Sequence, residues 1–205
     1  MKELELMYRG SLKSCNYHCS YCPFSRHRTS ERELWKDREQ WMKLLERLEE
    51  GVEDFVVRSF LVVPYGEALI HPWYWEGLAR ISRLSGIRGA GAQTNGSFLA
   101  EKSLKLFARA GGDPGKLRLW ITFHPEMTSV ETFVKTCRRL QEAGVRLCAG
   151  GVGVPQNIPV LQKLRQELPE ELYLWINRMD GLKRAYTEEE AEALRKIDPY
   201  FPREL

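Results

Sequence analysis

Three cysteines stand close together near the start of the chain, where Cys15, Cys19 and Cys22 follow a C-x3-C-x2-C spacing. Three thiolates in one short loop can wrap a single metal centre, and such soft sulfur ligands favour an iron–sulfur cluster or zinc. Three cysteines ligate only three irons of a four-iron cluster, so the fourth iron is left open to bind a molecule from outside. A catalytic metal site keeps one position open in the same way, whereas a structural site closes it. The spacing therefore predicts a metal centre that does chemistry.

A zinc site of three cysteines and one histidine is the alternative, with His18 or His27 as the fourth ligand. Such a site would make the protein a zinc-stabilised binding module rather than an enzyme. Zinc sites usually arrange their ligands as two separated pairs, and this loop does not. We therefore favour the iron–sulfur interpretation.

Other polar residues stand where predicted strands end. Thr122 and His124 share one face of a strand by alternation, at the end that would be open. His124 could bind substrate or move a proton, or it could be satisfied inside the core. Asn177 and Arg178 follow the last strand, where they could reach a cofactor's carboxylate or an acidic substrate, or could be solvated at the surface.

The elements that would position these residues alternate regularly between strand and helix. Ser30 and Glu33 form a capping box that predicts the start of a long helix, and Gly51 predicts its end. Alternation and helical periodicity place the other elements. The predicted strands cover 4–8, 55–63, 87–94, 117–123, 145–152 and 172–176, and the later helices cover 73–84, 98–110, 128–143, 158–168 and 187–197.

Six strand–helix units predict an α/β fold with a parallel sheet and helices outside it, curled into an incomplete (β/α)6 barrel. Barrels of this class place their chemistry in the loops that follow the carboxyl ends of the strands. The unusual residues of this chain gather in those loops. We expect one domain over residues 1–205, with a C-terminal tail at about 198–205.

Composition limits the possible classes of protein. The hydrophobic fraction of 43% and the charged fraction of 29% are ordinary for a soluble globular chain. No apolar run approaches the roughly 20 residues that span a bilayer, and the start of the chain has no apolar signal region. A net charge of +3 is too small to indicate a nucleic-acid partner without a concentrated basic patch, so none is expected. Three crowded cysteines among an odd total of five favour metal binding in a reducing cytoplasm.

The loop from Ser14 to Phe24, placed after the first strand of such a series, resembles the signature of the radical S-adenosylmethionine (SAM) superfamily. The resemblance implies a 4Fe–4S cluster on the three cysteines, with the open iron binding the amino and carboxylate groups of SAM. One electron then cleaves SAM to methionine and a 5'-deoxyadenosyl radical that abstracts hydrogen. Tyr21, just before the last cysteine, matches an aromatic residue that packs near the adenine in this family.

Further motifs match the family in order and spacing. The segment Tyr65-Gly66-Glu67-Ala68 resembles a Gly-Gly-Glu-Pro motif, which implies that Gly66 and Glu67 help to bind the SAM amino group; an ordinary turn is the alternative. Thr94 and Asn95, followed by Gly96, match a motif found after the third strand, although Asn-Gly also forms a tight turn alone. The segment around Gly151 is similar to a glycine-containing stretch that binds adenine, or it is a plain strand-to-helix turn.

The resemblance implies a radical SAM enzyme whose substrate is a peptide, a protein or a small molecule. A glycyl-radical-enzyme activating enzyme is an alternative within the same class, because a short chain with a single cluster suits that role. The expected partners are the substrate and a reductant such as flavodoxin or ferredoxin, with no membrane. Cys137 and Cys148 show no paired ligand spacing and are expected to be structural.

Overall fold

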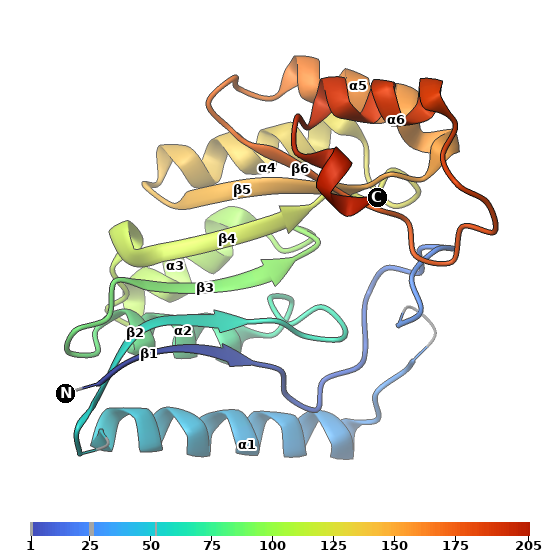
Figure 1. Ribbon diagram of the computed structural model, residues 1–205. Helices are drawn as coiled ribbons and strands as arrows, with labels where there is room; N and C mark the ends of the chain where they lie inside the picture. The colour runs from blue at the N-terminus through green and yellow to red at the C-terminus, as the bar shows by residue number, and fades with distance from the viewer. Residues whose placement is uncertain (1, 25–26, 52) are drawn as a thin grey trace.

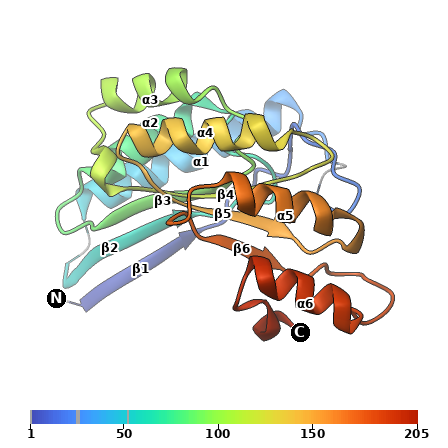
Figure 2. The same cartoon turned by 90° about the horizontal axis from the view of Figure 1, so that it is seen from above.

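The computed structural model describes residues 2–24, 27–51 and 53–205. Six parallel strands form one sheet in the order in which they occur in the chain (Figure 1). Each strand therefore pairs with the next strand along the sequence, and the sheet curls into a half-barrel (Figure 2). The strands are β1 Lys2–Tyr8, β2 Phe55–Val62, β3 Gly89–Thr94, β4 Leu117–Thr122, β5 Arg146–Val152 and β6 Leu174–Asn177. The predicted incomplete (β/α)6 barrel is confirmed.

Each strand is followed by a helix, and after β1 the cysteine loop comes between the strand and its helix. Seen from above, the helices cover the outer, convex side of the sheet (Figure 2). They are α1 Glu31–Glu50, α2 Pro72–Ser82, α3 Ala100–Arg109, α4 Val130–Glu142, α5 Ile158–Glu167 and α6 Glu188–Ile197. In the described part of the chain, no helix combines the length and the apolar composition that crossing a membrane requires.

Local signals explain where α1 starts and stops. Ser30 accepts a hydrogen bond from the backbone N–H of Glu33, and the Glu33 carboxylate accepts one from the backbone of Ser30. This reciprocal pair satisfies donors that the first turn of a helix leaves free. Gly51 ends the helix at a φ of 77°, a conformation that glycine adopts without steric cost. The predicted capping box is confirmed.

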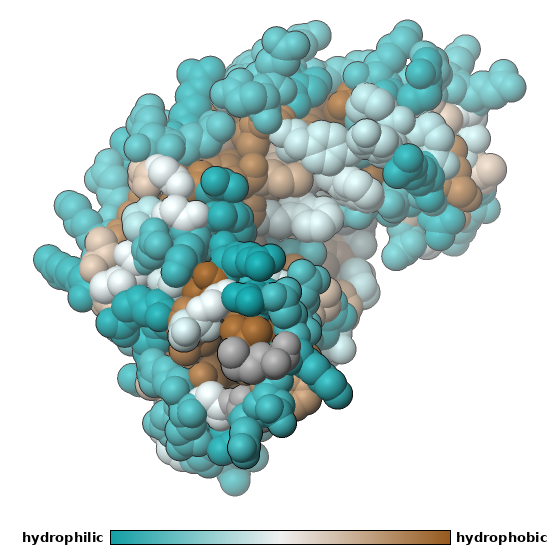
Figure 3. Space-filling view, turned by 60° about the vertical axis from the view of Figure 1, so that its left-hand side comes forward, coloured by the Kyte–Doolittle hydropathy of each residue, from teal (hydrophilic) through white to brown (hydrophobic). Residues whose placement is uncertain are grey.

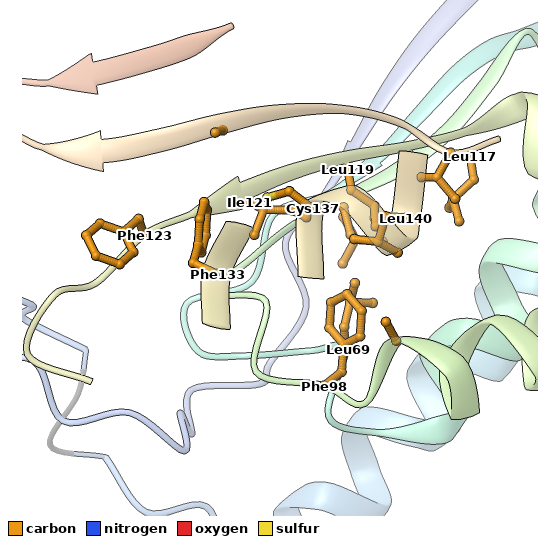
Figure 4. Close-up of a cluster of buried hydrophobic side chains, with 14 of the residues drawn as sticks. Leu69, Phe98, Leu117, Leu119, Ile121, Phe123, Phe133, Cys137 and Leu140 are labelled. Carbon is orange, nitrogen blue, oxygen red and sulfur yellow. The ribbon is translucent and has the colours of Figure 1, made fainter. Parts of the chain in front are cut away.

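The alternation of β4 separates the core from the opposite face of the sheet. Leu117, Leu119 and Ile121 are buried, and the helix α4 packs Phe133, Cys137 and Leu140 on the same side (Figure 4). The residues between them, Arg118, Trp120 and Thr122, are half-buried on the concave side. Cys137 is fully buried among apolar side chains, in keeping with a structural role.

The last residues of the chain pack against β6. Asp198 is buried, and its carboxylate accepts hydrogen bonds from the backbone N–H of Ile176 at 2.9 Å and from the Tyr173 hydroxyl at 2.7 Å. A short 3-10 helix, Phe201–Glu204, follows and buries Phe201 completely. The segment expected to be a tail thus completes the core behind the last strand.

Candidate active site

A pocket of about 150 Å³ lies at the carboxyl ends of the strands, where Figure 1 shows the cysteine loop passing. It brings together residues from the loops after β1, β2, β3 and β4. Eight of the predicted site residues line it, together with five others. The lining residues are Cys15, Tyr17, Cys19, Cys22, Pro64, Tyr65, Gly66, Glu67, Gln93, Thr94, Asn95, Thr122 and His124.

Gly66 brings the loop after β2 against the backbone of the cysteine loop. The backbone N–H of Glu67 donates to the carbonyl of Ser14 at 2.9 Å. A Cβ atom added at Gly66 would lie 1.8 Å from that same carbonyl oxygen. Only glycine therefore fits, and the close approach that it allows is to the loop that carries Cys15.

Glu67 joins the loop after β2 to the end of β3. Its side chain is only 1% exposed. One carboxylate oxygen accepts from the backbone N–H of Leu69 and from the Thr94 hydroxyl, both at 2.8 Å, and the other accepts from the backbone N–H of Asn95 at 2.6 Å. Burial raises the pKa of Glu67 to about 7, although the three donors favour its charged form.

Asn95 carries this connection on to the first cysteine. Its side-chain amide donates to the Asn16 side-chain oxygen at 3.1 Å and lies within hydrogen-bond distance of the Cys15 sulfur, at 3.6 Å. Its own side-chain oxygen accepts from the backbone N–H of Ser97 at 2.9 Å. The turn after β3 therefore holds the Cys15 end of the loop.

The loop after β4 contacts the other end of the cysteine loop. The Tyr21 hydroxyl and His124 Nδ1 are 2.9 Å apart, and their rings stack with centroids at 6.0 Å. Burial lowers the pKa of His124 to about 4 and raises the pKa of Tyr21 above its ordinary value. Both side chains are therefore neutral near pH 7. A histidine with so low a pKa is a weaker base than an unperturbed one, which bears on the role predicted for His124.

The three cysteines line one pocket. Over residues 2–24, 27–51 and 53–205, no group of three His, Cys, Asp or Glu side chains is arranged to hold a metal ion. Burial raises the pKa of the Cys15 and Cys19 thiols, that of Cys19 to about 11. A bound cation would reverse this shift, since metal ligands must be deprotonated.

A second pocket, of about 660 Å³, adjoins the first and shares Cys22 and His124 with it. It lies between the cysteine loop and the loop after β6, which approach each other in Figure 1. Its lining residues are Ser20, Tyr21, Cys22, Pro23, Phe24, His124, Val152, Asn177, Arg178, Met179, Asp180 and Gly181. Five predicted site residues, Tyr21, Cys22, His124, Asn177 and Arg178, thus meet here.

The polar residues at the end of β6 already have partners within the chain. The Asn177 side-chain oxygen accepts from the Trp175 indole N–H at 3.0 Å. Arg178 is half-exposed, and its guanidinium lies 3.7 Å from the Asp180 carboxylate. A weak, exposed ion pair of this length leaves the guanidinium free to turn toward an anion.

Gly151 is the one predicted site residue that lines neither pocket. A Cβ atom added there would meet Leu161 of α5 at 2.9 Å and Ile176 at 3.3 Å, so this position faces the helices. Its neighbour Gly150 faces the concave side, with an added Cβ 2.6 Å from the indole nitrogen of Trp120. Strand alternation separates the two glycines, and the sequence alone did not indicate which one faces inward.

Several residues that build the site were not predicted from the sequence. Asn16, next to Cys15, accepts a hydrogen bond from the Asn95 amide, and Gln93 lines the first pocket. Ser20 and Glu126 are hydrogen-bonded to each other. Glu126 stands two residues after His124 in a loop that follows a strand. Its position in that loop was the only sequence feature that could have indicated a role in the site. Its partner, Ser20, lies more than a hundred residues away in the sequence.

Comparison with known proteins identifies the fold. A solved structure described as native anSMEcpe with bound AdoMet, that is SAM, and Cp18Cys peptide is 15% identical, with a TM-score of 0.62. The alignment covers 97% of this chain and 60% of that one. A second, native anSMEcpe with bound AdoMet, is 13% identical with a TM-score of 0.62, over 96% of this chain and 59% of that one. The chain thus spans about 60% of the length of these structures, and at such identities the likeness shows the fold alone.

The sequence itself places the chain in a family. Among curated proteins, none matches it. The family model of the radical SAM superfamily matches residues 12–168, a range that contains the cysteine loop and both motifs at the ends of β2 and β3. Members of this family use a 4Fe–4S cluster and SAM. Together with the half-barrel, this match establishes that the chain belongs to the radical SAM superfamily.

Proposed function

We propose that Cys15, Cys19 and Cys22 hold the 4Fe–4S cluster and that the protein uses it to generate a radical from SAM. The observation that carries this proposal is the convergence of the three cysteines in one pocket with the loops after β2, β3 and β4. When bound and reduced, the cluster supplies the electron that splits SAM into methionine and a 5'-deoxyadenosyl radical, which abstracts hydrogen from the substrate.

The surroundings of the three cysteines suit such a cluster. The backbone of Ser14 and the Asn95 amide fix the Cys15 end, so the loop has a defined place beside the sheet. The Asn95 amide supports a negatively charged sulfur ligand, because hydrogen bonds to sulfur stabilise reduced clusters. The neutral Tyr21–His124 pair covers the loop from the side of β4 without adding charge.

The two adjoining pockets divide the binding of SAM between them. The smaller pocket is the place for the amino and carboxylate groups, next to the cysteines, Gly66 and Glu67. Three of roughly four acceptor positions on the Glu67 carboxylate are filled, which leaves one for the SAM ammonium. The larger pocket suits the adenosyl group, with Tyr21 as the aromatic surface and Asn177 or Arg178 at the opposite wall.

The substrate would reach the site from the concave side. The half-barrel leaves a hollow on one side of the molecule, seen in outline in Figure 3. We propose a peptide, a protein or a small molecule as the substrate, and a flavodoxin or ferredoxin as the source of electrons. The peptide class draws support from the solved structure that holds a peptide together with AdoMet.

Metal analysis and product analysis test the proposal. Anaerobic reconstitution should give about four irons and four sulfides per chain, and the reduced protein should release 5'-deoxyadenosine from SAM. Replacing Cys15, Cys19 or Cys22 by Ala should abolish a stable cluster, whereas Cys137→Ala should keep it. Stoichiometric zinc without sulfide would overturn the proposal in favour of a binding module.

A further inference from the structure

The cysteine loop is held at two places by different parts of the sheet. The Cys15 end is tied to the loops after β2 and β3 through Ser14 and Asn95. The other end, which carries Cys19 and Cys22, meets the loop after β4. A cluster with three sulfur ligands needs both ends at a constant separation, because its geometry is set by the metal.

Glu126 makes a two-pronged contact with Ser20, which stands between the second and third cysteines. One Glu126 oxygen accepts from the backbone N–H of Ser20 at 2.7 Å, and the other accepts from the Ser20 hydroxyl at 2.6 Å. Two parallel bonds to a carboxylate fix orientation as well as distance, and charge-assisted bonds of this length are among the strong ones. The residue next to Cys19 is thereby held in one position.

This contact is not part of the hydrophobic core. Ser20 and Glu126 are both exposed, and neither belongs to the cluster of buried hydrophobic residues. Water could satisfy both Ser20 donors if Glu126 were absent, so the fold itself does not need the bond. The bond instead determines where an exposed loop lies, which matters for whatever the loop binds.

We infer that Glu126 is a positioning residue for the cluster, acting through Ser20 on Cys19 and Cys22. The inference rests on the proposal that these cysteines are cluster ligands. Neighbouring residues that orient a metal ligand contribute to metal affinity although they never touch the metal. Glu126 bonds only to Ser20, which stands between two of the three proposed ligands. It does so from the loop after β4, whereas the Cys15 end is held by the loops after β2 and β3.

Iron release from the reconstituted holoenzyme tests the inference. Under anaerobic conditions an iron chelator should remove iron from Glu126→Ala about tenfold faster than from the wild type, which is at the low end for loss of such an orienting contact. Glu126→Gln should recover much of the difference, because it keeps the chain length and one acceptor oxygen. Glu131→Ala is the matched control: this exposed glutamate of α4 bonds to Lys163, away from the site, and its loss should leave the rate unchanged.

A double variant separates the proposed path from a general loosening of the protein. Ser20→Ala should speed iron release less than Glu126→Ala does, since the backbone donor remains. Adding Ser20→Ala to Glu126→Ala should produce no further change, because the hydroxyl has already lost its acceptor. The resonance spectrum of the reduced cluster should broaden in Glu126→Ala and recover in Glu126→Gln.

Equal release rates in the wild type and Glu126→Ala would overturn the inference, as would independent, additive effects of the two alanine variants. Urea unfolding of the apoproteins provides the check on folding. A Glu126→Ala protein that unfolds like the wild type while losing iron faster supports positioning. A wild-type protein that assembles no cluster would overturn the proposed function itself, and the inference with it.

Discussion

At the scale of single residues, the site combines recognisable chemistry with contacts that no sequence motif records. The cysteines are recognisable because their ligand chemistry depends on residue type and local spacing. The partners that hold them are not, because they depend on how distant strands come together. Glu67 belongs to both groups: its motif suggests a role, while its three hydrogen bonds, from Leu69, Thr94 and Asn95, emerge only in the fold.

Removing the Glu67 side chain should weaken SAM binding without preventing cluster assembly. Glu67→Ala deletes the free acceptor position and releases the backbone N–H of Asn95, which the carboxylate now holds. A lost hydrogen bond to a charged group is worth roughly 1.5 to 3 kcal/mol, or about ten- to a hundredfold in affinity. Titration of SAM, followed by the resonance spectrum of the reduced cluster, measures the change.

Glu76→Ala, on the helix α2 and lining neither pocket, is the comparison for that experiment. Unchanged SAM affinity in Glu67→Ala would reject the role of this side chain and leave the cluster assignment intact. Failure of the variant to take up iron would show instead that the Glu67 side chain acts mainly on the cysteine loop, through Asn95.

His124 should make the apoprotein less stable in weak acid. Its pKa is lowered from 6.5 to about 4 in the folded state, so the unfolded chain binds the proton more readily. The contribution of the neutral side chain to stability is complete above pH 6.5 and is lost as the pH falls toward 4. The slope from this group is at most about 1.4 kcal/mol per pH unit. Urea unfolding between pH 4.5 and 7.5 measures it.

The variant His124→Phe should reduce the loss of stability between pH 6.5 and 4.5, because it keeps a buried ring that does not titrate. His18→Gln is the control, since it replaces an exposed histidine and leaves His124 in place. A wild-type slope that persists in His124→Phe would assign the acid sensitivity to other groups.

At the scale of elements, most helices and strands follow from local rules. The capping box of α1 and the alternation of β4 act within a few residues, so the sequence reveals them. The orientation of neighbouring glycines is harder to predict. Gly150 and Gly151 are equivalent in sequence, and only the register of β5 against β4 turns the first toward the concave side. The packing of Phe201 behind β6 was likewise hidden, because prolines beside it suggested only the end of a helix.

Gly66 gives a prediction at this scale, because it joins two loops rather than contributing a side chain. Gly66→Ala would place a Cβ atom 1.8 Å from the Ser14 carbonyl oxygen, so the two loops must separate. The Glu67–Ser14 hydrogen bond would break, and the Cys15 end of the cysteine loop would move away from the sheet. We expect the variant to fold but to hold little iron after anaerobic reconstitution.

Gly89→Ala provides the control on this same sheet. An added Cβ at Gly89 meets its nearest atom at 3.4 Å, on the flexible Arg118 side chain, and should be accommodated. Equal iron content in Gly66→Ala and Gly89→Ala would show that the contact between the loops does not govern cluster assembly. Iron and sulfide analysis, with circular dichroism to confirm folding, measures both variants.

At the scale of the whole molecule, the half-barrel separates the two parts of the site along the sheet. The cysteines follow β1, at one edge, while Asn177 ends β6, at the other edge, and Arg178 follows it. The curl of the sheet brings these edges to a common pocket, which Tyr21 and Arg178 both line. The position of β6 thus affects one wall of the proposed SAM site, and Asp198 is the residue that ties β6 to the end of the chain.

Asp198→Ala should therefore weaken SAM binding while leaving cluster assembly largely intact. The substitution leaves the buried N–H of Ile176 without its acceptor and removes the partner of the Tyr173 hydroxyl. An unsatisfied buried donor costs about 1 to 3 kcal/mol, so the free energy of unfolding should fall by at least that amount. Because β1 and the cysteine loop lie at the opposite edge of the sheet, iron content should stay near that of the wild type.

The decisive comparison is between SAM affinity and iron content in the same preparations. Asp180→Ala removes a carboxylate from the loop after β6 that is almost fully exposed, so it should change neither the stability nor the iron content. If Asp198→Ala lowers stability but binds SAM as the wild type does, β6 does not form part of the SAM site, and the larger pocket would belong to the substrate alone. If it loses iron as well, the two edges of the half-barrel are coupled through the sheet. Weaker SAM binding at full iron content is the expected result, because only the far wall of the pocket has moved.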